Sequence, residues 1–96
     1  MTLSAVIYRF SDDVATRDRP RPEHRDYLSG LADQGLLLMS GPFGSGPDGA
    51  LLLFRSDDEA KVAALVGNDP FTLRGVVATT ETLAWDPVIG PLRSAL

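Results

Sequence analysis

Short apolar segments alternate with helix-like segments along this chain of 96 residues, and their order limits the folds open to it. Four segments are too short for buried helices and are rich in branched or aromatic side chains, which is typical of strands. These segments are Leu3–Phe10, Leu36–Phe43, Ala50–Phe54 and Val76–Trp85. We therefore expect four strands in one domain, since a chain of this length can build a single modest core.

Two further segments carry helix signals. The first runs from about Pro22 to Gln34, because proline suits the first helical position and Gly35 can end the helix in the left-handed conformation. The second is expected to begin with a capping box formed by Ser56 and Glu59 and to stop at Gly67. Each helix signal lies between two strand segments.

The connections are polar and rich in proline and glycine. Residues 11–22 contain two prolines and are predicted to form a loop, and residues 44–49 are predicted to form the turn of a hairpin. Pro42 cannot donate to a sheet ladder, so regular pairing should fail near it. The sequence allows a short helix after Pro70. Residues 87–96 are interpreted as a C-terminal tail that follows a domain spanning residues 1–86.

The predicted order of elements is β-α-β-β-α-β. Two crossovers around a hairpin give a ferredoxin-like α+β fold, in which a four-stranded antiparallel sheet carries both helices on one face. Apolar residues in the second and fourth strands suggest that the other face is apolar too, and a domain of this size is not expected to leave such a face in water. We therefore expect a symmetric homodimer that buries it.

Composition excludes several classes of function. The formal net charge of −4 argues against nucleic acid, which requires a basic surface. One arginine-rich stretch, residues 17–25, is interleaved with acidic residues, so we expect its local field to be small. No cysteine and only one histidine are present, so neither a metal site nor a metal cofactor is expected. No apolar run approaches the roughly 20 residues that span a bilayer. A cytoplasmic protein without membrane contact is expected.

The single histidine, His24, lies near the start of the first predicted helix. Spacings of three, four and seven residues place it on the same helix face as Tyr27, Leu28 and Leu31, which should pack into the core. A lone histidine in such a position is more often a hydrogen-bonded core residue than a catalyst. Spacing alone leaves both interpretations open.

Three short motifs occur in a recognisable order. They are Arg21-x-x-His24 in "RPEHRDYLSGLADQG", Ser40-Gly41-Pro42 in "LLLMSGPF", and Asp69-Pro70-Phe71 in "NDPF" ahead of a last strand that ends in Trp85. From about Leu3 to Trp85 the chain resembles the YCII-related (YciI-like) family. The resemblance implies a small dimeric ferredoxin-like protein, related to the dimeric α+β barrels, that binds a small molecule.

The resemblance also implies a site centred on His24 and Asp69, with Ser40, Gly41 and Pro42 lining its pocket. In such a pair the aspartate holds one imidazole nitrogen, and the other nitrogen can accept a proton as a general base. The helix N-terminus and Arg21 disfavour the charged imidazole, whereas Asp69 would favour it, and the sequence does not decide between them.

Two functions are compatible with this site. One is a cofactor-independent enzyme of lyase or isomerase type, in line with the lyase-like roles assigned to some family members. The other is a non-catalytic dimeric module that binds a small molecule or serves an accessory or regulatory role. In either case Arg21 could hold an anionic group, and Ser40 is better suited to donate a hydrogen bond than to act as a nucleophile. Tyr8 and Trp85 are expected in the core or the dimer interface.

Overall fold

Strands and helices follow one another in the predicted order in the computed structural model, which describes residues 2–96. The elements are β1 (Leu3–Phe10), α1 (Ala15–Asp18), α2 (Arg21–Asp33), β2 (Leu37–Pro42), β3 (Gly49–Phe54), α3 (Glu59–Gly67), α4 (Pro70–Leu73), β4 (Val77–Trp85) and a 3₁₀-helix, η1 (Pro91–Ala95). Each predicted strand and helix is therefore present, with small differences at the ends.

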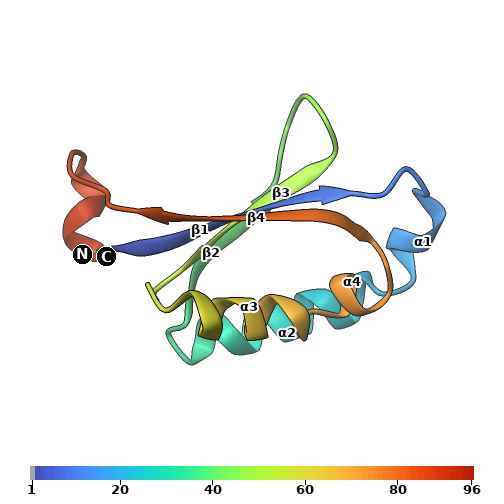
Figure 1. Ribbon diagram of the computed structural model, residues 1–96, viewed down its shortest axis with the longest axis horizontal. Helices are drawn as coiled ribbons and strands as arrows, with labels where there is room; N and C mark the ends of the chain where they lie inside the picture. Colours follow the sequence, from blue (N-terminus) through green and yellow to red (C-terminus); the bar gives the residue numbers. More distant parts are fainter. Residues whose placement is uncertain (1) are drawn as a thin grey trace.

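The four strands form one antiparallel sheet in the order β2-β3-β1-β4. Helices α2, α3 and α4 all lie on the same face of this sheet (Figure 1). The arrangement confirms the ferredoxin-like α+β fold. Within residues 2–96, no helix combines the length and the apolar character needed to cross a membrane.

The core lies between the sheet and the helices. Alternation along β1 directs Val6 and Tyr8 to the helix side, where both are completely buried. They pack with buried side chains of α2, α3 and the two hairpin strands. These are Leu28, Leu31, Leu37, Ala50, Leu52, Phe54, Val62 and Val66. The central strand β1 therefore presents its inner residues directly beneath the helices.

Three local expectations were wrong. The β2–β3 ladder does not fail near Pro42, which pairs in register with Ala50, and its irregularity lies between Leu37 and Met39. Proline is tolerated in β2 because this is an edge strand. Part of the segment predicted as a loop forms the short helix α1, in which Arg17 is buried and donates hydrogen bonds to Ser11 O and Asp48 Oδ2. These two contacts fix the turn against the β2–β3 hairpin. The second long helix begins one residue after Asp58, and no capping box forms with Ser56.

The Asp58 carboxylate caps α3 because it lies directly before the first helical residue and reaches the free amides of Ala60 and Lys61. The Ser56 hydroxyl accepts a hydrogen bond from Asp58 N at 3.2 Å. Two other features agree with expectation. Gly35 follows α2 with φ of 77°, and the short helix α4 begins at Pro70.

The face of the sheet away from the helices carries apolar side chains. Residues directly opposite one another in an antiparallel ladder share a face. One row across the sheet consists of Met39, Leu53, Ala5 and Leu83. Within this row Met39 is 50% exposed and Leu83 is 47% exposed, and the nearby Leu51 and Trp85 are also exposed. An apolar surface therefore remains open to solvent in one chain.

Candidate functional site

The carboxylate of Asp69 is the centre of the site. Its side chain is completely buried, at the N-cap of α4. Oδ1 accepts a hydrogen bond from Phe71 N at 2.9 Å and lies 2.7 Å from His24 Nδ1, and Oδ2 accepts one from Tyr8 OH at 2.8 Å. Donors from α2, α4 and β1 thus converge on one buried carboxylate.

His24 is held in place on two sides. Its Nδ1 atom contacts Asp69, and its ring stacks on Phe71 with 3.7 Å between ring centroids and an interplanar angle of 4°. An ionised carboxylate can only accept hydrogen bonds, so Nδ1 carries the proton in this contact. A neutral His24 therefore has its lone pair on Nε2, and this atom has no hydrogen bond to any residue in 2–96. The side chain is 13% exposed.

The hydroxyl of Tyr8 is a part of the site that the sequence did not reveal. Burial, and then the charge of Asp69 to which it donates a hydrogen bond, raise the pKa of Tyr8 far above its usual value. Burial and the same charge also raise the pKa of Tyr27, whose hydroxyl donates to Leu65 O at 2.7 Å. Strand alternation shows only that Tyr8 faces inward, so no sequence signal could identify its acceptor.

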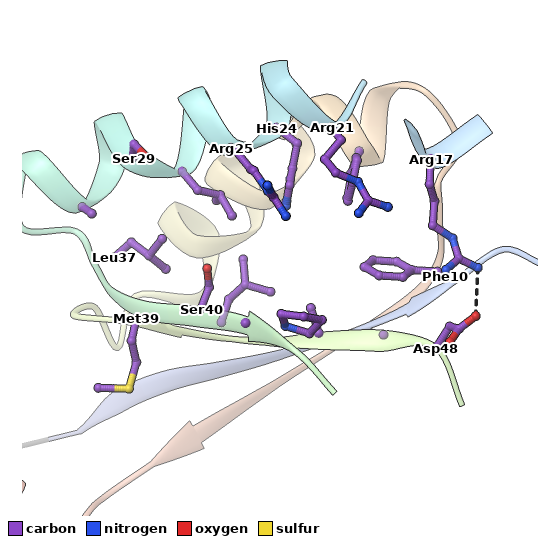
Figure 2. A pocket seen from close by; sticks show the side chains of 18 residues that line it. Phe10, Arg17, Arg21, His24, Arg25, Ser29, Leu37, Met39, Ser40 and Asp48 are labelled. Carbon is purple, nitrogen blue, oxygen red and sulfur yellow. Dashed lines mark hydrogen bonds and ion pairs between the residues drawn. The ribbon is translucent and has the colours of Figure 1, made fainter. Parts of the chain in front are cut away.

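A cleft of about 620 Å³ lies between α2 and the β2–β3 hairpin, and His24 forms part of its wall (Figure 2). All the residues predicted to bind substrate also line this cleft. They are Arg21, Ser40, Gly41 and Pro42. Asp69 does not line it, because this side chain lies buried behind the imidazole.

Sequence reasoning missed four further polar residues of the cleft wall, Arg17, Arg25, Ser29 and Asp48. The first was assigned to a loop, and the second lies next to His24 on α2. Ser40 pairs with the buried Leu52 across the hairpin, which places its hydroxyl on the helix side of the sheet. No group of three or more potential metal-ligating side chains occurs among residues 2–96.

The fold and the site together define the class of this protein. It is a ferredoxin-like α+β domain in which a histidine at the wall of a cleft contacts a buried aspartate. The sequence profile of the YCII-related domain matches residues 1–86, and the chain belongs to this family. No curated protein gives a significant sequence match.

Solved structures resemble the chain over most of its length. The 5-chloro-2-hydroxyhydroquinone dehydrochlorinase TftG of Burkholderia phenoliruptrix AC1100, in complex with 2,5-dihydroxybenzoquinone, is 27% identical with a TM-score of 0.70, over 86% of this chain and 93% of TftG. TTHA0845 of Thermus thermophilus is 20% identical with a TM-score of 0.57, over 94% of this chain and 99% of the other. Atu4242 of Agrobacterium tumefaciens is 16% identical with a TM-score of 0.59, over 92% and 94%.

Tyr8 should stay protonated above pH 10.0, the ordinary pKa of tyrosine, while the protein is folded. Because the pKa of Tyr8 is raised on folding, its contribution to stability is fully present below pH 10.0 and is lost as the pH rises above it. Ultraviolet absorbance of tyrosinate, followed with circular dichroism, should show that one of the two tyrosines ionises only as the protein unfolds. Ionisation of both tyrosines near pH 10.0 in a protein that remains fully folded would contradict the buried Tyr8–Asp69 contact.

Proposed function

We propose that this protein is a small cofactor-independent enzyme that transfers a proton in a small-molecule substrate, in a reaction of lyase or isomerase type. The observation that carries the proposal is how the two ring nitrogens of His24 are placed. Its Nδ1 atom is tied to a buried carboxylate, whereas Nε2 has no partner among residues 2–96 and the side chain lines the cleft. A general base requires a fixed imidazole with one accessible nitrogen, and such a base contributes roughly 10²–10⁴-fold to a proton transfer.

Asp69 has a positioning role in this proposal. Its carboxylate selects the tautomer with the proton on Nδ1, and it stabilises the imidazolium that forms when Nε2 accepts a proton. Tyr8 and Phe71 N occupy further acceptor sites of the carboxylate, so Asp69 cannot turn away from the imidazole without losing buried hydrogen bonds. The base is therefore fixed before substrate binds.

The remaining predicted residues are assigned to substrate binding. Ser40 can donate a hydrogen bond from the floor of the cleft, and Arg21 can contact an anionic group. Gly41 and Pro42 bring the backbone of β2 to the cleft without bulky polar side chains. A neighbour in the same fold supports lyase chemistry, because TftG is a dehydrochlorinase and its structure contains 2,5-dihydroxybenzoquinone. A small planar ring of that kind is a reasonable first substrate class.

Replacing His24 by asparagine should separate catalysis from folding. The asparagine amide can still donate to Asp69 from a position near that of Nδ1, but it cannot accept a proton as a base. We expect turnover to fall by at least about 100-fold. The unfolding free energy should change by less than about 1 kcal/mol, against about 1–3 kcal/mol for His24→Ala, which leaves the buried acceptor short of a donor.

The assay is chloride release from 5-chloro-2-hydroxyhydroquinone, with binding of 2,5-dihydroxybenzoquinone and a chemical melt of each variant in parallel. If His24→Asn lowers stability but changes neither turnover nor binding, His24 is a structural residue and the proposal fails. Binding that depends on His24 without any turnover supports the other function, a non-catalytic small-molecule module.

We also propose that the protein works as a homodimer in which two copies bury the open face of the sheet. The support is the row of apolar side chains that includes Met39 and Leu83 and continues to Leu51 and Trp85. A single apolar patch of this kind on a small domain is typical of an association surface. Symmetric pairing through the same patch on both copies is the simplest closed assembly. A cytoplasmic location stays a prediction.

Leu83→Glu should convert the dimer into a monomer, because the substitution places a charge on the apolar face that two copies would bury. Leu73→Glu is the control, since Leu73 is the same residue type and is also exposed but lies on α4, on the helix side. Sedimentation velocity at about 10 μM should give a dimer for the wild type and the control and a monomer for Leu83→Glu. A monomeric wild type at that concentration would refute the dimer.

A further inference from the structure

We propose that the cleft selects substrates that carry an acidic group, a carboxylate or an ionised phenol, and that Arg21 and Arg25 bind this group beside His24. The inference rests on the proposed function, because it concerns the same cleft, and it names the substrate class. The observation that supports it is the charge of the cleft wall, which has the opposite sign to the net charge of the whole chain.

The chain as a whole is acidic, with a formal net charge of −4. The wall of the cleft is basic. Its basic residues are Arg17, Arg21 and Arg25, and its only acidic residue within the described range 2–96 is Asp48. With a neutral His24 the side chains of the wall carry a formal net charge of +2. A basic cleft in an acidic protein concentrates small anions, and its low-dielectric walls strengthen the attraction.

The acidic neighbours in sequence offset this charge only in part, because none of them lines the cleft. Glu23 pairs with Arg74 at 3.4 Å, outside the cleft wall, and Asp26 does not line the cleft. Asp18 contacts Arg21 at 3.3 Å, but its side chain is largely exposed and forms no part of the wall. The interleaved acids therefore lie on the outer side of α1 and α2.

The arginines differ in how far the protein already satisfies them. Arg17 is 8% exposed, and its guanidinium contacts Ser11 O, Asp48 and the ring of Phe10, so it is held in place and its charge is paired with that of Asp48. Arg21 has one ion pair, with the largely exposed Asp18, and its buried Nε atom, like that of Arg17, has no acceptor among residues 2–96. Arg25 has no ion pair within the same described range. Arg21 and Arg25 thus keep donors that a ligand can use.

The positions of these side chains suit a substrate that is also within reach of His24. Arg21 and Arg25 flank His24 on α2, three residues before it and one residue after it, and all three extend from the helix toward the sheet (Figure 2). Guanidinium groups bind planar carboxylates through paired hydrogen bonds. The same positive charge would stabilise the anion that forms when His24 removes a proton.

The test compares benzoate with benzamide, which has nearly the same shape but no charge, and with inorganic phosphate. Binding to the wild-type protein is measured by protein-observed NMR titration up to about 20 mM, a range that detects even weak ligands. The variants are Arg21→Gln and Arg25→Gln. Arg19→Gln is the matched control, because it removes the same charge from the same stretch of sequence but does not line the cleft.

We expect benzoate to shift cleft resonances and to bind at least tenfold more tightly than benzamide. Arg21→Gln and Arg25→Gln should each weaken benzoate at least threefold, and Arg19→Gln should not. Stronger binding of phosphate than of benzoate would identify a phosphate site and overturn the proposed class. Equal binding of benzoate and benzamide, equal loss in Arg19→Gln, or no shift with any probe would overturn the inference. His24→Asn reports separately on the proposed function, because it changes turnover without removing the arginine contacts.

Discussion

The organisation of this protein depends on one buried carboxylate. Asp69 is completely shielded from solvent, and an isolated charge in that position would cost several kcal/mol. The cost is offset because three donors meet the two oxygens, from Tyr8, His24 and the backbone of Phe71. These donors belong to β1, α2 and α4, so the carboxylate connects the central strand to the helix layer. Losing one donor would leave a charge only partly satisfied and weaken the junction of all three elements.

The same group has a structural and a chemical role, and the two do not conflict. Asp69 caps α4 through Phe71 N and so fixes the turn that leads into β4. Through its contact with Nδ1 it also fixes the proton position and the orientation of His24. The ring of Phe71, placed by that cap, covers one face of the imidazole. The interpretation of "NDPF" as a capped turn and its interpretation as part of a site are therefore compatible.

The sequence was most informative where local signals agree with the tertiary structure. Strand β1 and helix α2 lie within about a residue of their predicted positions, because β-branched residues, proline and Gly35 all favour what packing requires. The contact between His24 and Asp69 joins residues 45 apart, and only the resemblance to a known family indicated it. Element order alone does not determine which loops meet at one end of a sheet.

Other features could not be predicted, because several residues are chemically suited to the same role and only the folded geometry decides between them. Ser56 and Asp58 are both good capping residues, and the backbone path decides in favour of Asp58. The arginine-rich stretch has a balanced charge in sequence, yet folding places Arg17 and Arg25 at the cleft. A count of charges along the chain cannot show which side chains face inward. Tyr8 likewise resembles an ordinary core residue until the position of Asp69 is known.

The central claim is that Asp69 holds the proton of His24 on Nδ1 and leaves Nε2 free for a substrate. Long-range ¹H–¹⁵N NMR of the imidazole measures this directly. The chain has a single histidine, so the imidazole signals need no assignment to a residue. At a pH where His24 is neutral, the spectrum should show a protonated Nδ1 and an unprotonated Nε2. The Asp69→Ala variant, which removes the acceptor at Nδ1, should lose this preference. A proton on Nε2 in the wild type, or a tautomer that Asp69→Ala does not change, would contradict the account.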